Sequence, residues 1–141
     1  MLSLELLFQI MERRKFIGLS AYTAIAFSLP IVGGCMQKPI DKNFADPALF
    51  RRITGEKNIR ETGEDYLKQF PAEKDQRKLA ELLTQGSESP DASDAARLNE
   101  FFDKRIKDDF KSGRTVVANG WVLSLTEARQ CALYTLLEPA K

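Results

Sequence analysis

The feature that most constrains this chain is an apolar segment near its beginning, because it separates a signal from the residues that can build a fold. Residues 11–35 run from a basic start through an apolar stretch to small residues, which is the order of an export signal. The apolar stretch is interrupted by polar residues, glycine and proline, and is shorter than the about 20 residues of a membrane-spanning helix. A cleaved signal is therefore favoured, and a permanent transmembrane helix is the alternative.

Two short motifs indicate the type of signal. Arg13 and Arg14, followed after one position by Phe16, resemble the twin-arginine motif, which an export receptor reads as an address. Val-Gly-Gly directly before Cys35 resembles a lipobox, which would make Cys35 the lipid-bearing first residue of the mature protein. Acyl chains there would tether the protein, since each buried CH₂ contributes about 0.8 kcal/mol. We expect a lipid-anchored protein on the periplasmic side of a bacterial membrane, with inner and outer membrane both open.

These motifs divide the chain into three parts. Residues 1–34 are expected to be the signal, with Met11 as the true start because the ten residues before it do not fit in front of a twin-arginine motif. Residues 35–45 are expected to be a flexible spacer, and residues 46–141 a single helical domain with one modest hydrophobic core.

Composition and missing motifs limit the functions open to this domain. The chain has 21 basic and 20 acidic side chains, which leaves no basic footprint for nucleic acid, and no histidine, the commonest general base and metal ligand. It also lacks a phosphate-binding loop, a nucleophile elbow and zinc-type spacing. Asp108 and Asp109 are consecutive, so they point to different helix faces and are expected to be solvated. We expect no catalytic residue, and no metal or cofactor bound by this chain.

Hydrophobic periodicity and turn residues predict a mainly α fold, a small bundle of about five helices with one short β-hairpin before the last. The first helix is expected to start with Asp46 as N-cap and Pro47 as its first residue, and to end at Gly55. Pro71 is expected to open the third helix, in which Glu73 is solvated. The other predicted helices are residues 58–70, 71–84, 92–111 and 125–137.

Apolar side chains at helical spacing predict which faces are buried. The core-facing residues expected on the second and third helices are Ile59, Tyr66, Leu67, Phe70, Leu79, Leu82 and Leu83. Those expected on the fourth helix are Ala95, Leu98, Phe102, Ile106 and Phe110.

The C-terminal block carries the most distinctive local signals. Two β-prone runs, 115–118 and 121–123, are joined by Asn119-Gly120, the preferred residues of a type I′ turn. Ser124 and Glu127 then have the spacing of a capping box, which starts the last helix. Trp121 can be a core anchor or a partner-facing hot spot. Arg129 can form a surface ion pair or meet a partner's carboxylate.

The signal MERRKFIGLS, the pairs Tyr66-Leu67 and Asp109-Phe110, and above all residues 119–129 (NGWVLSLTEAR) resemble a known family. It comprises the gluconate 2-dehydrogenase subunit 3-like small subunits that accompany flavin-dependent dehydrogenases of the glucose-methanol-choline class. The resemblance implies a non-catalytic helical partner that escorts a folded flavoprotein through twin-arginine export and stays bound to it. FAD would belong to that large subunit, and the complex can include a cytochrome subunit. The candidate partner interface is Trp121, Leu123, Glu127, Arg129 and Tyr134.

Two other functions stay open. One is a free-standing envelope lipoprotein that binds a small ligand or an envelope component in a cleft between helices. The other is a redox role for Cys131, which becomes a lone thiol once Cys35 is lipidated. The alternative for Cys131 is a small buried residue packed in a helix, as free cysteines commonly are.

Overall fold

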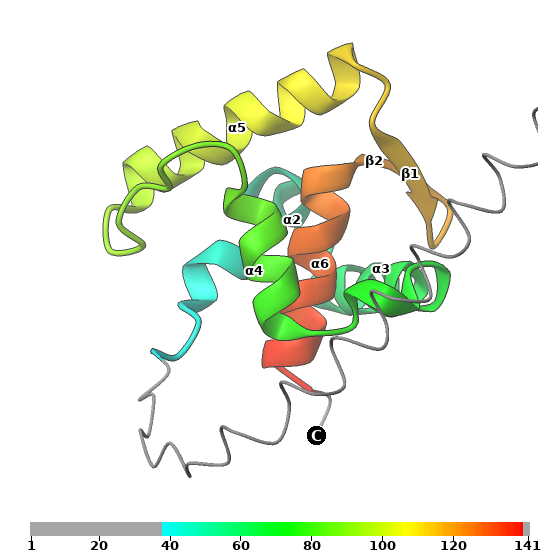
Figure 1. Ribbon diagram of the computed structural model, residues 1–141. Helices are drawn as coiled ribbons and strands as arrows, with labels where there is room; N and C mark the ends of the chain where they lie inside the picture. Colours follow the sequence, from blue (N-terminus) through cyan, green and yellow to red (C-terminus); the bar gives the residue numbers. More distant parts are fainter. Residues whose placement is uncertain (1–37, 140–141) are drawn as a thin grey trace, which may run out of the picture. The chain divides into compact units, whose positions relative to one another are not determined.

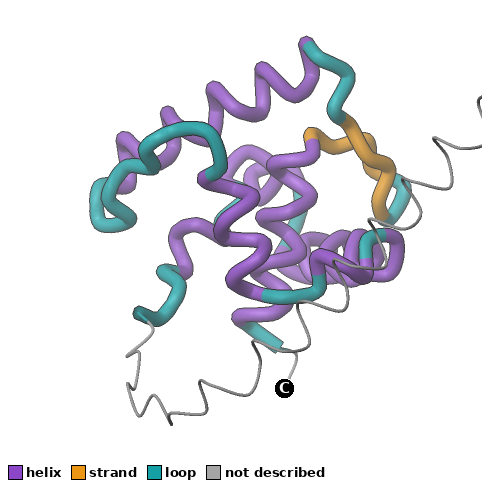
Figure 2. Tube along the Cα trace, in the orientation of Figure 1, coloured by secondary structure: helices purple, strands orange, loops and turns teal. Residues whose placement is uncertain are grey.

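The computed structural model describes residues 38–139, and within them it has five α-helices, two short 3₁₀ turns and one β-hairpin (Figure 1). Figure 2 distinguishes the helices from the hairpin by colour along the same path. The predicted mainly α fold, with a hairpin before the last helix, is confirmed. In chain order the elements are η1 (Lys42–Ala45), α2 (Ala48–Ile53), α3 (Glu56–Gln69), η2 (Pro71–Glu73), α4 (Gln76–Thr84), α5 (Ala95–Lys111), β1 (Thr115–Ala118), β2 (Trp121–Ser124) and α6 (Leu125–Leu137).

Helix α6 is the central element of the core. It contacts α3, α4, α5, η1 and both strands, and in Figure 1 it lies between α3 and α4, with α5 across its first turn. Ala128, Cys131, Ala132 and Leu133 of α6 have no exposed surface. Because three of these side chains are small, neighbouring helices can approach the α6 backbone closely.

Gly63 marks the closest approach of α3 to α6. A Cβ atom added there would lie 2.3 Å from the carbonyl oxygen of Cys131 and 2.3 Å from Oγ1 of Thr135, whereas real Cβ atoms essentially never come within 3.0 Å of another heavy atom. The Thr135 hydroxyl lies 2.9 Å from the Cys131 carbonyl and 3.2 Å from that of Arg60 and can donate to either, so it links the two helices. Glycine is less favourable than alanine inside a helix. It occurs at position 63 because the close contact with α6 leaves no room for a side chain.

The hairpin and the start of α6 have the predicted local structure. β1 and β2 pair antiparallel with Ala118 opposite Trp121, and Asn119 and Gly120 have φ of 50° and 79°, the two positive values that a type I′ turn requires. The capping box of α6 is also confirmed. Oγ of its N-cap serine accepts the backbone N–H of Glu127 at 3.0 Å, and the Glu127 carboxylate accepts the N-cap N–H at 3.1 Å.

Helices α3 and α5 start at Glu56 and Ala95, close to the predicted residues 58 and 92, and two other helix starts differ in kind from the sequence prediction. Residues 71–84 are not one helix, because Asp75 has extended backbone and its carboxylate accepts the N–H of Lys78 at 2.9 Å, which starts α4 after the separate turn η2. The predicted N-cap of α2, Asp46, is also wrong, since Pro47 holds that position. The Asp46 carboxylate instead accepts a hydrogen bond from Nε of Arg51 at 2.6 Å.

The predicted core stripe of α5 is buried only in its middle. Leu98, Phe102 and Ile106 are buried, but Ala95 and Phe110, at the two ends of the helix, are exposed. The helix is longer than the core that it covers, so its first and last turns lie outside that core. Periodicity alone predicts a face and does not show where the covering elements end.

On α3, Tyr66 and Leu67 are buried as predicted, whereas Phe70 is 36% exposed. Phe70 follows the last residue of the helix, where the chain turns, and its ring stays against Tyr66 with centroids 4.6 Å apart. Phe70 is predicted to be buried because it continues the helical spacing of Ile59 and Tyr66. The helix ends at Gln69, so this spacing no longer determines which way the Phe70 side chain points.

The packed part of the chain begins before residue 46. η1 contacts α6, and Ala45 is 1% exposed. Nε2 of Gln130 donates to the backbone carbonyls of Phe44 and Asp46, at 3.3 and 3.1 Å. The flexible spacer predicted for residues 35–45 therefore does not include Lys42–Ala45, because these residues pack on the last helix.

Candidate functional site

The five residues predicted as a partner interface are not all at the surface. Leu123 is 4% exposed and belongs to the core, and Glu127 is 7% exposed because its carboxylate is used in the capping box of α6. Arg129 is engaged inside the chain, with 17% of its side chain exposed. Trp121 and Tyr134 are partly exposed. The prediction is thus corrected for Leu123 and Glu127, whose side chains are structural.

Trp121 is at once a packing residue and a surface residue. Its ring meets that of Phe50 edge to face, with centroids 5.3 Å apart and an interplanar angle of 81°. Phe50 is 2% exposed, whereas Trp121 is 37% exposed. The contact fixes the orientation of the indole and joins β2 to α2, while part of the indole stays open to solvent.

Large apolar side chains are exposed on α2 and on the hairpin. Ile53 is 73% exposed and lies one helical turn from Leu49, which is 40% exposed. Val117 and Val122 face each other across the hairpin and are 58% and 64% exposed. We call Leu49, Ile53, Trp121, Val117 and Val122 the apolar surface residues. Of these residues only Trp121 is predicted from the sequence as a candidate interface residue, because the others are ordinary apolar residues of very short elements.

The hairpin is held in place by α3. Nε2 of Gln69 donates to the backbone carbonyl of Val117 at 2.8 Å, and Oδ2 of Asp65 accepts the backbone N–H of Asn119 at 2.9 Å. These bonds connect one strand and the turn to a helix more than 45 residues earlier in the chain. The exposed valines therefore lie on an element that α3 holds in place.

Tyr134 is held by charged side chains of α2 and α3. The guanidinium groups of Arg51 and Arg60 lie 5.1 and 5.5 Å from its ring centroid, and its hydroxyl hydrogen-bonds Glu56. The hydrogen bond to Glu56 raises the pKa of Tyr134 above its usual value. Tyr134 thus connects the last helix to α2 and α3.

Glu73 joins η2, α3 and α6 through one carboxylate. Its two oxygens accept Nη2 and Nε of Arg129 at 2.8 and 3.0 Å, and one of them also accepts the hydroxyl of Tyr66 at 2.6 Å. Burial raises the pKa of Glu73, but the bonds from Arg129 and Tyr66 outweigh it, so the pKa lies below its usual value. The prediction of a solvated Glu73 is wrong, and Arg129 meets a carboxylate of its own chain.

Asp109 is also buried, contrary to the expected solvated face, whereas Asp108 is exposed as predicted. Oδ2 of Asp109 accepts the backbone N–H and the hydroxyl of Thr126 at 2.8 and 2.6 Å. Oδ1 accepts Nε of Arg114 at 2.9 Å. The carboxylate thus adds a second cap to α6, where a negative charge is favourable beside the helix N-terminus, and its role is structural.

A cleft of about 390 Å³ opens between α2 and α5. Its apolar wall includes Leu49, Phe102 and Ile106, and its polar lining consists of Asp46, Arg52, Asn99, Glu100, Asp103 and Gln130. The volume is in the range of small-molecule sites.

Cys131 is a free thiol with no exposed surface. Burial raises its pKa well above the usual value, and a reactive cysteine needs the opposite, an accessible thiolate. Its setting is that of a small core residue. Within residues 38–139, no group of three or more cysteine, aspartate or glutamate side chains is placed to hold a metal ion.

The export and lipidation residues, Arg13, Arg14, Phe16 and Cys35, lie outside the described residues. Among the helices of residues 38–139, none has both the length and the apolar character needed to cross a membrane.

Comparison of the chain with family models, with curated proteins and with solved structures gives no match.

Proposed function

We propose that this protein is a non-catalytic accessory subunit of an oxidoreductase complex. In this proposal it binds a folded flavin-dependent dehydrogenase subunit, escorts it through twin-arginine export and stays bound to it at the membrane through lipid on Cys35. FAD belongs to the large subunit. The proposal combines the resemblance of residues 119–129 to the small subunits of such enzymes with the surface that the fold presents.

The observation that carries this proposal is the set of apolar surface residues. Ile53, Val117 and Val122 are more than half exposed, and Trp121, a residue type enriched at interface centres, is open to solvent on one side. Val117 and Val122 are one position along their strands from the pair Ala118 and Trp121, so the two valines lie on the face of the hairpin opposite to the indole and the apolar surface residues form more than one exposed face. A partner that covers these side chains would remove them from water.

The charged residues closest to the core support a non-catalytic role. The carboxylates of Glu73 and Asp109 are occupied by hydrogen bonds from Arg129, Tyr66, Arg114 and Thr126. These contacts hold the last helix in place and leave the two carboxylates without a free oxygen for acid–base work.

The first test is purification of the tagged full chain from its native membrane in mild detergent, followed by mass spectrometry and absorbance in the flavin region. We expect a stoichiometric large flavoprotein. A chain that purifies alone under conditions that preserve other membrane complexes would refute the proposal.

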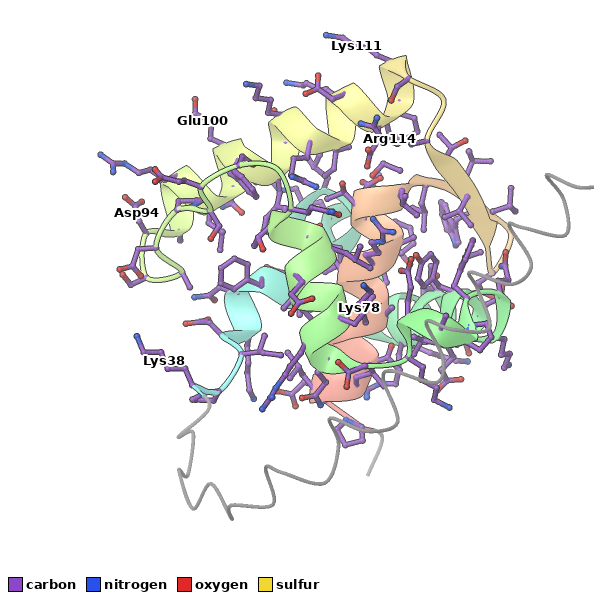
Figure 3. The ribbon with its side chains drawn as sticks, viewed as in Figure 1. Lys38, Lys78, Asp94, Glu100, Lys111 and Arg114 are labelled. Carbon is purple, nitrogen blue, oxygen red and sulfur yellow. The ribbon has the colours of Figure 1, made fainter. Side chains whose placement is uncertain are left out.

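Surface variants then locate the interface. Ile53→Ser and Val122→Thr remove apolar surface from residues that are 73% and 64% exposed, so neither should lower the free energy of unfolding by more than about 0.5 kcal/mol. We expect both to reduce recovery of the flavoprotein. Lys111→Ala is the matched control, because Lys111 is exposed and extends away from the helices at the end of α5 (Figure 3).

The cleft between α2 and α5 supports a second candidate, a free-standing envelope lipoprotein that binds a small ligand. Glu100, Asp103 and Arg52 beside an apolar wall suit a ligand with an apolar body and polar groups that both donate and accept hydrogen bonds. Native mass spectrometry of the purified full chain tests this candidate, with Asn99→Trp, at an exposed lining residue, as the variant that fills the cleft. A retained small molecule that Asn99→Trp displaces would favour it over the subunit.

A further inference from the structure

A second cavity, of about 360 Å³, opens between the end of α4, the last turns of α5 and the first turns of α6. Unlike the cleft beside α2, it is lined mainly by charged side chains. The lining that matters here is Arg105, Asp108 and Asp109 of α5, Arg114 after it, and Thr126 and Arg129 of α6.

Arg105 brings a positive charge to this cavity without a carboxylate partner. Its terminal nitrogens donate to the backbone carbonyls of Gln85 and Leu82, at 2.8 and 3.3 Å, at the end of α4. Its Nε is buried and has no hydrogen-bond partner within the described residues. Carbonyl oxygens orient the guanidinium but do not neutralise it.

Arg114 and Arg129 leave donors unused. Arg114 donates through Nε to Asp109, and Arg129 donates through Nε and Nη2 to Glu73. Within residues 38–139, the two terminal nitrogens of Arg114 and Nη1 of Arg129 have no recorded acceptor. About half of the Arg114 side chain is exposed, and Figure 3 shows Arg114 beside the start of α6.

The positive charges around the cavity are not equally compensated. Asp109 accepts a hydrogen bond from Arg114, and Glu73, which is not part of the lining, accepts two from Arg129, whereas Arg105 donates only to carbonyl oxygens. Burial and the positive charges of Arg129 and Arg114 lower the pKa of Arg105, although Asp109 opposes them. Arg105 is therefore the guanidinium group without a hydrogen-bonded carboxylate, and an anion beside it would compensate its charge.

We propose that this cavity binds a small oxyanion ligand, a carboxylate or a phosphate, between Arg105, Arg114 and Arg129. The planar guanidinium group matches either oxyanion with paired N–H donors. The volume is that of a small-molecule site. This site is distinct from the apolar surface residues, so the proposal does not depend on the identity of the partner subunit.

The probes are sodium citrate and sodium phosphate, titrated into the full chain in mild detergent at constant ionic strength, with sodium chloride as the reference salt. Isothermal titration calorimetry gives the affinity, and a thermal shift gives an independent readout. Citrate and phosphate distinguish a carboxylate from a phosphate ligand, and saturation by either one supports the site.

Three variants test the location. Arg114→Gln removes a positive charge with free donors and should weaken binding roughly tenfold. Asp108→Asn removes a carboxylate that has no recorded hydrogen bond from its side chain, so it should tighten binding severalfold while the fold is kept. Lys104→Gln removes one positive charge from the same helix outside this cavity and is the control for net charge.

Saturable binding that is weakened by Arg114→Gln, tightened by Asp108→Asn and unchanged in Lys104→Gln is the expected result. The proposal is overturned if neither probe gives a saturable signal up to about 10 mM beyond that of chloride. It is also overturned if Lys104→Gln weakens binding as much as Arg114→Gln, or if Asp108→Asn leaves the affinity unchanged. The Asp108→Asn result decides the matter even if Arg114→Gln fails to fold.

Discussion

Replacing Gly63 with alanine tests the packing of α3 on α6 directly. In an open helix position this substitution stabilises a protein by about 0.4–1 kcal/mol, because alanine restricts the unfolded chain and favours the helix. At Gly63 the new methyl group would meet the Cys131 carbonyl oxygen and Thr135 Oγ1 at 2.3 Å. One of these atoms is backbone and cannot rotate away, so the two helices have to separate.

The size of the effect follows from that separation. The contacts have to open from 2.3 Å to at least 3.0 Å, and forced overpacking of this kind typically costs about 1–3 kcal/mol. The hydroxyl of Thr135 also lies 3.2 Å from the carbonyl of Arg60 across the same contact, and losing a hydrogen bond there would cost about 1 kcal/mol more. After subtraction of the intrinsic gain from alanine, we expect a net loss of about 2–3 kcal/mol in the free energy of unfolding.

Urea denaturation followed by far-ultraviolet circular dichroism measures this loss. The matched control is Gly55→Ala, at the start of α3, where an added Cβ would have no atom within 4 Å. We expect the control to lose no more than about 1 kcal/mol, since glycine is only moderately better than alanine at an N-cap, and the φ of −86° at Gly55 is accessible to alanine. Equal stabilities of the Gly63→Ala and Gly55→Ala proteins would refute the argument that Gly63 is required by close helix packing.

Three further predictions concern buried polar groups. Thr62→Val should raise the free energy of unfolding by about 1 kcal/mol, because the buried Thr62 hydroxyl has no partner among the described residues and valine has its shape; a lower urea midpoint would contradict this. The pKa of Glu73 is lower in the folded chain than its usual value of 4.5, so the ionised carboxylate stabilises the fold at higher pH and this stabilisation is lost as the pH falls below that value. Glu73→Gln should therefore flatten the acid limb of a curve of unfolding free energy against pH. An unchanged acid limb would show that the ion pair of Glu73 with Arg129 contributes nothing to stability. Asp109→Asn should lower the free energy of unfolding by about 2 kcal/mol, since the charge-assisted hydrogen bonds from Thr126 are lost. A loss below about 0.5 kcal/mol in urea denaturation would show that this second cap does not stabilise α6.

The parts of the fold that sequence predicts best are those whose signals are local. The Asn119-Gly120 turn requires only two adjacent residues that accept positive φ. The capping box of α6 requires only a serine and a glutamate three residues apart. Both determine where an element starts, and the bounds of the hairpin and of the last helix follow from them.

Residues whose role depends on distant partners could not be assigned in this way. Glu73 is an acidic residue in a charged segment until α6 brings Arg129 against it from 56 positions later in the chain. Asp109 looks like one half of a solvated acidic pair until the hairpin returns Thr126 to it. The ring of Trp121 packs on Phe50 and keeps an exposed side, so it is not a fully buried core anchor, and its contact with a partner stays a prediction.

The central position of α6 has a consequence for the time at which this chain can fold. Every other described element precedes α6 in the sequence, and α3 and α4 pack directly on it. Isolated helices of their length are marginal in water, so during synthesis they have no stable partner until residues 125–137 have left the ribosome. The nascent chain therefore stays open and exposed to proteases until α6 emerges, and then acquires its core in a single late step.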